Sequence, residues 1–398
     1  MDDVVIIGAG PAGLAAAAML RAHQIDAVLL ERGQSVGEPW RARYDRLHLH
    51  TIRWLSNLPG YRIPTDFGRW VARDHFVEYL KQYAAHHHLA PRFGVEAIRI
   101  DRENGRWLVR TSTGTIPARV VVVASGYTRV PNLPQWPGAF DGPVVHSADY
   151  RNPKPYRGKD VLVVGAGNSG TEIALDLAEG EAGRVRIAIR TSPNILRRDP
   201  RGFPIQLLGI AVQRVPPRLL DVMFGALRRA TVPDLSAKGL PRPSAPFSQF
   251  RSTATVPVID VGFVDAVRNG SIEVVPGVTA LDGRAVVLAN GTRVYPDTVI
   301  AATGYRPGLE PLVGNVTPIG PHGIPSPQPR LHFLGIGTPI SGWLYQVGKD
   351  ARRLARDIAT ETGRSPGDTV RASAESREQR SPSAADRAGP KDCTACGD

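Results

Sequence analysis

The chain has 398 residues, 42% of them hydrophobic and 22% charged, which is typical of an ordinary globular protein. The formal net charge of +12 comes mainly from arginines spread along the chain without a nucleic-acid-binding motif, so we expect no nucleic-acid partner. The length allows two domains with separate hydrophobic cores.

Cysteine usage and hydropathy bear on where the protein works. The two cysteines, Cys393 and Cys396, lie among the last six residues, which excludes a secreted disulfide scaffold and favours a reducing cytoplasm. Apolar runs stay shorter than the roughly eighteen residues of a membrane-spanning helix, so we expect no stable membrane insertion. The apolar N-terminus is better explained as strand, glycine turn and helix than as a signal peptide.

The N-terminal region predicts a nucleotide-binding β-α-β unit with a strand, a helix and a strand at residues 4–7, 12–21 and 27–30. In the connecting GAGPAG, Gly8 would make the tight turn, Gly10 would admit a pyrophosphate and Gly13 would allow close helix–strand packing. Glu31 directly follows the second strand, where a carboxylate accepts hydrogen bonds from ribose hydroxyls and repels a 2′-phosphate. The first site is therefore predicted to bind FAD or NAD, not NADP.

Two elements are predicted between this unit and the middle of the chain. Residues 76–84 carry apolar side chains at helical spacing and predict an amphipathic helix. Residues 106–111 alternate between apolar and charged side chains, which indicates hairpin strands leading to a buried strand at 121–127.

A second β-α-β unit is predicted at residues 160–190, with GAGNSG between its first strand and its helix. Its last strand ends in Arg190 and Thr191, with no acidic residue at the position of Glu31. A guanidinium and a hydroxyl there suit a 2′-phosphate, so we expect NADPH at this site.

The domain organisation follows from a repeated strand motif. DTVIAATGY at 297–305 echoes ARVVVVASGY at 118–127, which indicates two crossovers at the borders of an insertion. We therefore predict an α/β fold with two dinucleotide-binding, Rossmann-like domains, the NADPH domain being inserted into the FAD domain. The expected limits are 1–155 and 296–360 for the FAD domain, 156–295 for the NADPH domain, and 361–398 for a disordered tail.

The segment between the two glycine motifs, FDGPVVHSADY at 140–150, fits F-x-G-x(3)-H-x(3)-Y. It resembles the identifying sequence of the class B flavin-containing monooxygenases, and Tyr150 stands where Baeyer–Villiger enzymes usually have Trp. Further segments resemble the YUCCA-type members and their bacterial relatives, namely WRARYDRLHLHT at 40–51, KGLPRP at 238–243, residues 255–278 and AATGY at 301–305. The resemblance extends from residue 3 to about residue 360.

This resemblance implies an NADPH-dependent FAD monooxygenase. NADPH would reduce FAD, reduced FAD would capture O2 as a C4a-hydroperoxide, and one oxygen atom would pass to a small organic substrate. The substrate is expected to be an α-keto acid such as indole-3-pyruvate, or a nucleophilic nitrogen or sulfur compound. Because the reactivity belongs to the cofactor, few acid–base side chains are needed, and we expect no metal.

The resemblance also assigns site residues. The residues expected to contact FAD are Gly8, Gly10, Pro11, Ala12, Gly13, Glu31, Arg32 and Trp40, with His50 and Thr51 near the ring system. Those expected to contact NADPH are Gly165, Gly167, Asn168, Ser169, Gly170, Arg190 and Thr191. The residues expected to couple the domains, without proton transfer, are Phe140, Gly142, His146 and Tyr150. Asn57 is the candidate catalytic residue.

Alternative functions share this architecture. An NADPH oxidase would return reduced oxygen as peroxide, and a redox sensor would bind both nucleotides without turnover. A disulfide reductase needs a redox-active cysteine pair beside the flavin or in the NADPH domain, but residues 1–392 contain no cysteine.

Overall fold

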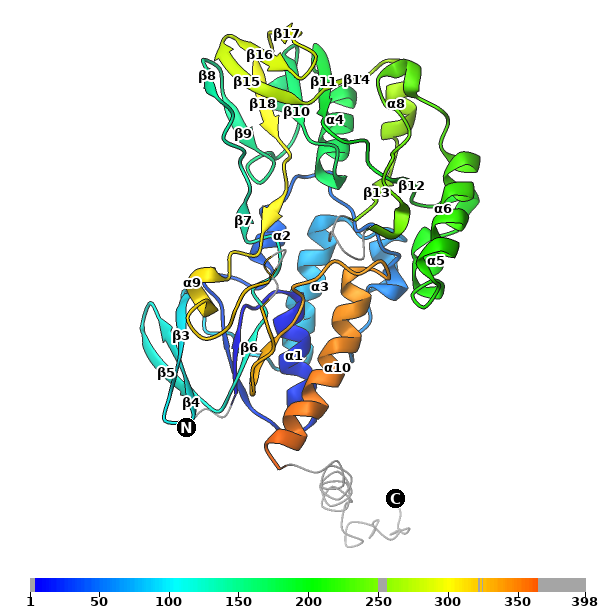
Figure 1. The fold of residues 1–398 in the computed structure, drawn as a ribbon. Helices are drawn as coiled ribbons and strands as arrows, with labels where there is room; N and C mark the ends of the chain where they lie inside the picture. Colours follow the sequence, from blue (N-terminus) through cyan, green and yellow to red (C-terminus); the bar gives the residue numbers. More distant parts are fainter. Residues whose placement is uncertain (1–3, 250–255, 321–322, 324, 364–398) are drawn as a thin grey trace, which may run out of the picture.

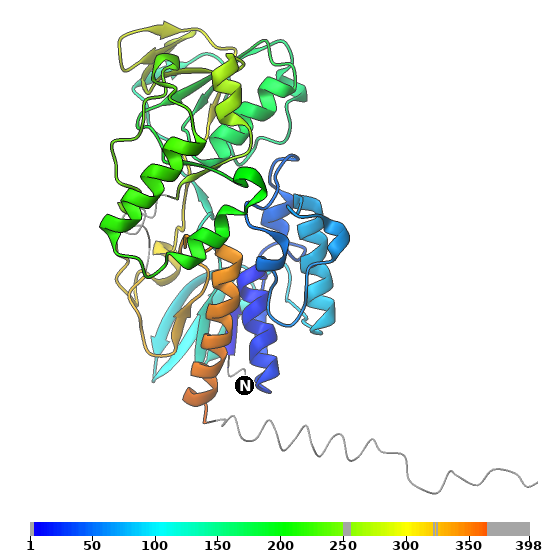
Figure 2. The same ribbon diagram turned by 90° about the vertical axis from the view of Figure 1, so that its right-hand side faces the viewer.

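The computed structural model describes residues 4–249, 256–320, 323 and 325–363, which form two α/β lobes joined by two crossovers (Figures 1 and 2). The first lobe is built on a parallel sheet in the order β2-β1-β6-β20. Strands β1 and β6 are fully buried and rich in valine, as expected for a parallel sheet covered on both faces. Helices α1, α3 and α10 pack on one face, and the antiparallel sheet β3-β4-β5 packs on the other.

The elements of the first lobe are β1 (Val4–Ile7), α1 (Pro11–Ala22), β2 (Ala27–Leu30), α2 (Glu38–Arg41), η1 (Arg53–Leu55), η2 (Thr65–Phe67), α3 (Arg73–His86), β3 (Ala97–Glu103), β4 (Arg106–Thr111), β5 (Gly114–Ala118), β6 (Val120–Val123), α9 (Glu310–Val313), β20 (Leu331–Phe333) and α10 (Trp343–Glu361).

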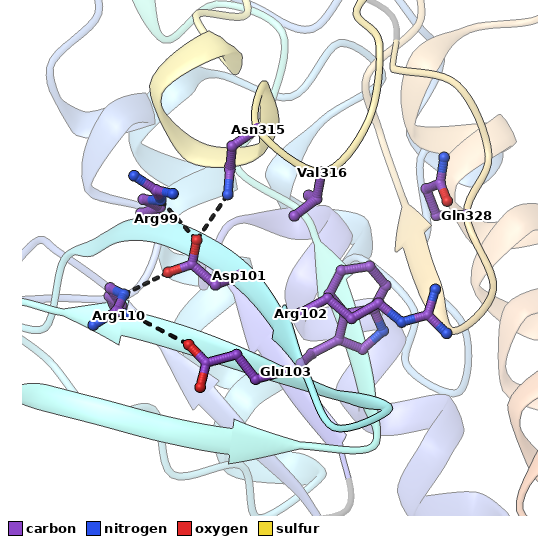
Figure 3. A pocket seen from close by; sticks show the side chains of 9 residues that line it. Arg99, Asp101, Arg102, Glu103, Arg110, Asn315, Val316 and Gln328 are labelled. Carbon is purple, nitrogen blue, oxygen red and sulfur yellow. Dashed lines mark hydrogen bonds and ion pairs between the residues drawn. The ribbon is translucent and has the colours of Figure 1, made fainter.

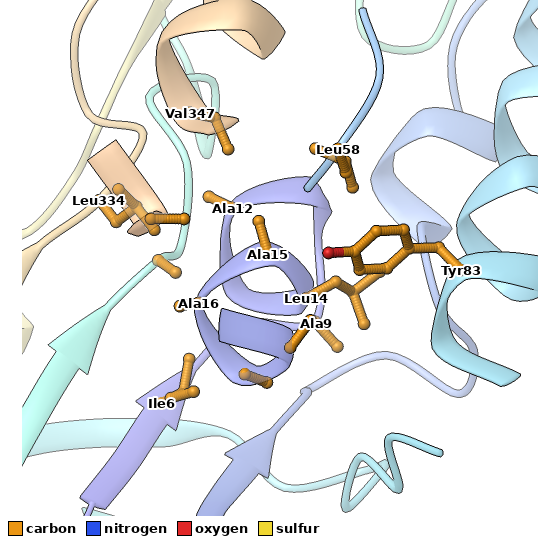
Figure 4. Packing of buried hydrophobic residues seen from close by; sticks show 14 of the residues in the cluster. Ile6, Ala9, Ala12, Leu14, Ala15, Ala16, Leu58, Tyr83, Leu334 and Val347 are labelled. Carbon is orange, nitrogen blue, oxygen red and sulfur yellow. The ribbon is translucent and has the colours of Figure 1, made fainter. Parts of the chain in front are cut away.

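The alanine-rich sequence of α1 reflects its position between other helices. Ala12 and Ala16 are buried in the same core as Val347 of α10, and Tyr83 of α3 packs beside Leu14 (Figure 4). Because side-chain size sets how closely two helices approach, the small residues let α1 and α10 run side by side. This places the first turns of both helices at the carboxyl edge of the sheet.

The second lobe repeats this layered plan. Its parallel sheet has the order β14-β11-β10-β18-β9. Helices α4 and α8 pack on one face, and the sheet β17-β16-β15-β8 packs on the other. The elements are β8 (Gly138–Phe140), β9 (Val144–His146), η3 (Lys154–Tyr156), β10 (Asp160–Val164), α4 (Asn168–Glu179), β11 (Arg184–Ile189), α8 (Phe263–Asn269), β14 (Glu273–Pro276), β15 (Val278–Gly283), β16 (Ala285–Leu288), β17 (Arg293–Val294) and β18 (Thr298–Ala301).

A helical extension of the second lobe lies between β11 and β14 in the sequence. Its elements are β12 (Ile195–Arg197), η4 (Pro200–Gly202), α5 (Ile205–Ala211), α6 (Pro217–Thr231), η5 (Ser236–Lys238), η6 (Phe247–Gln249) and β13 (Val258–Asp260). It has a small core of its own, in which Phe224 stacks on Phe247 at 3.8 Å between ring centroids. Figure 2 shows α5 close to the start of α10, so the extension reaches toward the first lobe.

The predicted fold class is confirmed, since the second lobe interrupts the first and the chain then returns for β20 and α10. The predicted limits at 155 and 296 require correction, because β8, β9 and β18 pair within the sheets of the second lobe. The crossovers instead include β7 (Val130–Pro131) and β19 (Tyr305–Arg306), which pair antiparallel with each other.

The repeated strand motif has a structural basis. β6 lies beside β1 in the first sheet, and β18 lies beside β10 in the second, so each strand occupies the equivalent position in its own sheet. The chain end differs slightly from the prediction, because α10 continues to Glu361 with Ile358 and Ala359 buried. The rest of the predicted tail, residues 364–398 with Cys393 and Cys396, lies outside the described residues. Among the residues that are described, no helix combines the length and apolarity needed to cross a bilayer.

Candidate active site

The first glycine turn is shaped by contacts that exclude side chains. Gly8 has φ of 106°, and a methyl group there would lie 2.7 Å from the carbonyl oxygen of Ala124. A methyl group at Gly13 would lie 1.8 Å from the carbonyl oxygen of Gly8. At Gly10, by contrast, a methyl group would meet nothing within 4 Å. The turn is therefore packed on its inner side and open at Gly10. Helix α1 begins at Pro11, and no side-chain cap bonds to the N–H groups of its first turn.

Glu31 is fixed beside this turn. Its carboxylate is buried, and its two oxygens accept hydrogen bonds from the N–H groups of Ala9 and Gly33, each at 2.8 Å. Each carboxylate oxygen has a second lone pair, so the group can also accept hydrogen bonds from a ribose. The location predicted for the ribose-binding acid is thus occupied by an oriented carboxylate.

The second glycine turn has nearly the same geometry. Gly165 has φ of 105°, and its added methyl group would lie 2.6 Å from the carbonyl oxygen of Ala302. At Gly170 the methyl group would lie 1.9 Å from the carbonyl oxygen of Gly165, and at Gly167 it would meet nothing within 4 Å. Both turns therefore fit the close approach of a dinucleotide pyrophosphate.

The side chain of Asn168 is occupied by protein contacts at this turn. Its Oδ1 accepts a hydrogen bond from the Ile259 N–H at 2.7 Å, and its Nδ2 donates to the carbonyl oxygen of Pro257 at 3.3 Å. The amide holds β13 against the start of α4.

The strand end beside the second turn differs from that of the first. β11 ends at Ile189, and the next two residues, Arg190 and Thr191, are exposed. A guanidinium and a hydroxyl thus stand where the first lobe has the buried Glu31.

The start of α10 lies next to the first glycine turn. A methyl group added at Gly335 would lie 2.9 Å from Cβ of Ala12, and the indole Nε1 of Trp343 donates to the carbonyl oxygen of Gly335 at 3.1 Å. At the N-cap of α10, Gly342 has φ of 96°, and an added methyl group would lie 2.7 Å from Cγ2 of Thr51. Thr51 is therefore placed at the helix start.

Three of the other residues predicted to contact FAD make contacts elsewhere in the protein. Trp40 is half-buried and meets Phe76 edge-on, with 4.6 Å between ring centroids. Arg32 is exposed and lies 4.0 Å from Glu96. His50 instead directs its Nε2 to Glu172 of α4, so its imidazole makes a contact between the lobes.

Glu172 is a point of attachment between the lobes. Its side chain is 5% exposed, and besides His50 it accepts a hydrogen bond from the Tyr44 hydroxyl at 3.0 Å. Burial, followed by the nearby Glu172 carboxylate, raises the pKa of Tyr44 well above its ordinary value. One helical turn on, Asp176 lies 3.8 Å from Arg46. The segment at 40–51 thus docks onto the helix that follows the second glycine turn.

His146 and Tyr150 of the identifying segment contact residues at the junction of the lobes, whereas Phe140 and Gly142 lie toward the opposite end of the second lobe (Figure 1). Phe140 is in β8, and a methyl group at Gly142 would lie 2.6 Å from its ring. The buried Tyr150 hydroxyl donates to Asp176 at 2.7 Å. These contacts are structural, and a role of the segment in coupling the domains stays a prediction.

His146 is held as a neutral imidazole. Its Nδ1 accepts a hydrogen bond from the Ala148 N–H at 3.1 Å, so its Nε2 carries the proton that is donated to the carbonyl oxygen of Gly304 at 3.2 Å. Burial lowers the pKa of His146. Its ring also meets Tyr305 edge-on at 5.1 Å.

Arg43 is a junction residue that was not among the residues predicted from the sequence. Its guanidinium lies 4.6 Å from the ring centroid of Tyr305 and donates to the Tyr305 hydroxyl. It also donates to Oγ1 of Thr128 at 2.8 Å. Thr128 and Tyr305 each follow one of the glycine-ended strands, so Arg43 connects both crossovers. Its position in WRARYDR and that of Tyr305 in AATGY could have suggested this pairing.

Asn57, the candidate catalytic residue, supports a loop. Its Oδ1 accepts a hydrogen bond from the Ile63 N–H at 2.8 Å, and its Nδ2 donates to the carbonyl oxygen of Trp54 at 3.0 Å. The second N–H of the amide has no hydrogen bond among the contacts of the described residues. A catalytic role for Asn57 stays a prediction.

A surface pocket of about 590 Å³ lies on the β3–β4 hairpin, and no glycine-turn residue lines it (Figure 3). Its polar groups pair with each other, since Asp101 accepts hydrogen bonds from Arg99 at 2.7 Å, from Asn315 at 2.8 Å and from Arg110. It is not the site where two dinucleotides could meet. Within the described ranges, no group of three or more His, Cys, Asp or Glu side chains could hold a metal ion.

The fold and the two glycine turns define a class of two-dinucleotide oxidoreductases. Residues 5–201 match the family described as "Pyridine nucleotide-disulphide oxidoreductase". A flavin monooxygenase mutant from Stenotrophomonas maltophilia superposes with a TM-score of 0.70 at 26% identity, covering 91% of this chain and 100% of that one.

Relatives by sequence identify the family within this class of oxidoreductases. The chain is 38% identical to "Indole-3-pyruvate monooxygenase YUCCA1" of Oryza sativa subsp. japonica, over 90% of this chain and 91% of that protein. It is 33% identical to "Probable indole-3-pyruvate monooxygenase YUCCA8" of Arabidopsis thaliana, over 90% of this chain and 89% of that protein. The chain therefore belongs to the YUCCA-type family of flavin-containing monooxygenases. Enzymes of this class use FAD and NADPH, and each lobe of this chain has one dinucleotide turn.

Proposed function

We propose that this monooxygenase converts an α-keto acid, with indole-3-pyruvate as the first candidate. The balanced reaction inserts one oxygen atom and releases the carboxyl group: R–CO–COOH + NADPH + H⁺ + O2 → R–COOH + CO2 + NADP⁺ + H2O. The observation that carries the proposal is the 38% identity to an indole-3-pyruvate monooxygenase over 90% of the chain, together with the matched glycine turns.

The first lobe is proposed to hold FAD. Phosphates would approach the open side of Gly10 at the start of α1, and Glu31 would accept hydrogen bonds from the ribose. The ring system would extend toward the start of α10, where Thr51 lies. When bound, FAD would supply the electron transfer and oxygen chemistry, because that reactivity belongs to the cofactor. The remaining proposed contacts are Gly8, Pro11, Ala12, Gly13, Arg32, Trp40 and His50.

The second lobe is proposed to hold NADPH. The exposed Arg190 and Thr191 would bind the 2′-phosphate, and the open side of Gly167 would admit the pyrophosphate. The other proposed contacts at this turn are Gly165, Asn168, Ser169 and Gly170. A neutral, hydrogen-bonded His146 would keep the junction in place without exchanging a proton.

Oxygen-18 labelling tests the function directly. The FAD-loaded protein is mixed with NADPH, ¹⁸O2 and indole-3-pyruvate, with a tertiary amine and a thioether in parallel reactions. Each reaction is run with and without catalase, because free hydrogen peroxide itself converts an α-keto acid to the acid and CO2. We expect one labelled oxygen in the acid product and about one CO2 for each NADPH consumed. Hydrogen peroxide formed in equal amount to NADPH with every substrate would overturn the monooxygenase proposal and favour an NADPH oxidase. Labelled amine or sulfur oxide alone would overturn the keto-acid assignment.

We also infer a cytoplasmic location and no nucleic-acid partner. The absence of cysteine before Cys393 and the dispersed arginines support this inference. Cell fractionation of the tagged chain, with a nuclease-treated control, tests both statements.

A further inference from the structure

Gln206 lies where the helical extension of the second lobe meets the first lobe. It is the second residue of α5, and its side chain is buried, with 5% of the residue exposed. A buried amide needs partners for both its oxygen and its nitrogen, because an unpaired buried polar group is costly.

Both partners of Gln206 belong to the first lobe. Its Oε1 accepts a hydrogen bond from the Ile52 N–H at 3.0 Å, and its Nε2 donates to the carbonyl oxygen of Ser341 at 2.9 Å. Ile52 follows Thr51, and Ser341 precedes the N-cap of α10. The amide thus joins the two backbone segments that flank the start of α10.

Two glycines make this contact close. A methyl group at Gly342 would lie 2.5 Å from Nε2 of Gln206, and one at Gly209 would lie 2.5 Å from the carbonyl oxygen of Ile340. Gly209 is on α5, so the helix approaches the 340–342 segment at two separate points. Ile340 also packs against the small core of the extension.

We propose that Gln206 is a positioning residue that holds α5 closed over the start of α10 and so keeps water away from the reacting end of the site. The proposal rests on the monooxygenase function proposed above. A closed site excludes water and prevents side reactions of reactive intermediates. With α5 loosened, more of the NADPH should be spent in the uncoupled reaction NADPH + H⁺ + O2 → NADP⁺ + H2O2.

The test compares Gln206→Met with wild-type protein. Methionine has a similar length but leaves the Ile52 N–H and the Ser341 carbonyl without their partner. We expect the peroxide share of the NADPH consumed to rise roughly threefold or more. In hydrogen–deuterium exchange, the Ile52 amide should exchange about tenfold faster, with and without bound cofactors. The exposed Gln135, replaced by Met, is the matched control and should change neither quantity.

Gln206→Glu separates positioning from loss of packing. An ionised carboxylate still accepts from Ile52 but cannot donate to the Ser341 oxygen, whereas a protonated one can. The peroxide share of Q206E should therefore fall toward the wild-type value as the pH is lowered from about 8.5 to about 6. A purely structural loss would show no such pH profile.

The outcomes are distinguishable. Unchanged peroxide and unchanged Ile52 exchange in Q206M would overturn the proposal, as would faster exchange without a change in peroxide. If wild-type protein itself transfers no labelled oxygen to indole-3-pyruvate, the proposed function fails. The exchange measurement would still report whether Gln206 holds α5 in place.

Discussion

The two glycine turns have almost the same backbone geometry, but their surroundings at the neighbouring strand end differ. An added methyl group would lie 2.7 Å from the nearest carbonyl oxygen at Gly8 and 2.6 Å at Gly165. The corresponding distances are 1.8 Å at Gly13 and 1.9 Å at Gly170. In each lobe the carbonyl group that approaches the first glycine belongs to the residue just after the adjacent parallel strand, so the sheet topology fixes this part of the turn. Because the turns are alike, we expect the residue after the neighbouring strand to select the cofactor. This residue is Glu31 in the first lobe and Arg190 in the second.

The largest difference between the two lobes is expected when a side chain is introduced at the last glycine of one turn, Gly13 or Gly170. Gly13→Val should lower FAD affinity roughly 100-fold, as expected for a clash of about 3 kcal/mol, and the protein should purify with little flavin. Gly170→Val should retain flavin, but NADPH should reduce it far more slowly. Flavin absorbance per protein and stopped-flow reduction measure the two effects.

The open glycines provide the control for this pair. Methyl groups at Gly10 and Gly167 would meet nothing within 4 Å, so Gly10→Ala and Gly167→Ala should melt within about 1 °C of wild type. Each variant should nevertheless bind the cofactor of its own lobe more weakly. Equal loss of flavin in G13V and G170V would contradict the division of cofactors between the lobes.

Both turns could be predicted from the sequence because their glycines and strands lie within short, continuous segments. Glu31 was predicted at its strand end for the same reason. The domain limits were misplaced because β9 and β18 are far apart in sequence and pair only in the folded sheet. Contacts such as that of Gln206 with Ser341 depend on long-range docking, which no local pattern encodes.

The next largest effect should come from removing the buried carboxylate of the first lobe. Glu31→Ala leaves the Ala9 and Gly33 N–H groups without their acceptor and removes the proposed ribose contact. We expect FAD affinity to fall about 30-fold, or about 2 kcal/mol. Titration of apoprotein with FAD, followed by flavin fluorescence, measures it. Glu31→Gln retains one acceptor oxygen, so its FAD affinity should lie between those of wild type and E31A. An unchanged FAD affinity in E31A would refute the assignment of Glu31 to the ribose.

A smaller effect is expected from removing Arg190, which follows the last residue of β11 in the second lobe. Arg190→Ala should lower kcat/KM for NADPH about tenfold, as expected for loss of one charge-assisted phosphate contact. The value for NADH should not change, because NADH lacks the 2′-phosphate. Arg229→Ala, which removes another exposed arginine, is the control. A parallel loss with NADH and NADPH would show that Arg190 does not bind the 2′-phosphate.

The smallest expected effect concerns the crossover of the second lobe, where His146 holds the carbonyl group of Gly304. Burial lowers the pKa of His146 in the folded state, so folding favours the neutral imidazole. The resulting stability is present above the ordinary histidine pKa of about 6.5 and is lost as the pH falls through the lower, folded-state value.

His146→Gln tests this pH dependence, because an amide can accept from Ala148 and donate to Gly304 without titrating. Between pH 7.5 and 5.5, wild-type Tm should fall by about 2 °C more than that of the variant. Differential scanning fluorimetry at both pH values measures the difference. The comparison between proteins is needed because burial also lowers the pKa of His87, which both contain. Equal pH dependence in the two proteins would mean that His146 can accept its second proton at the junction, and a proton-transfer role for it would then have to be reconsidered.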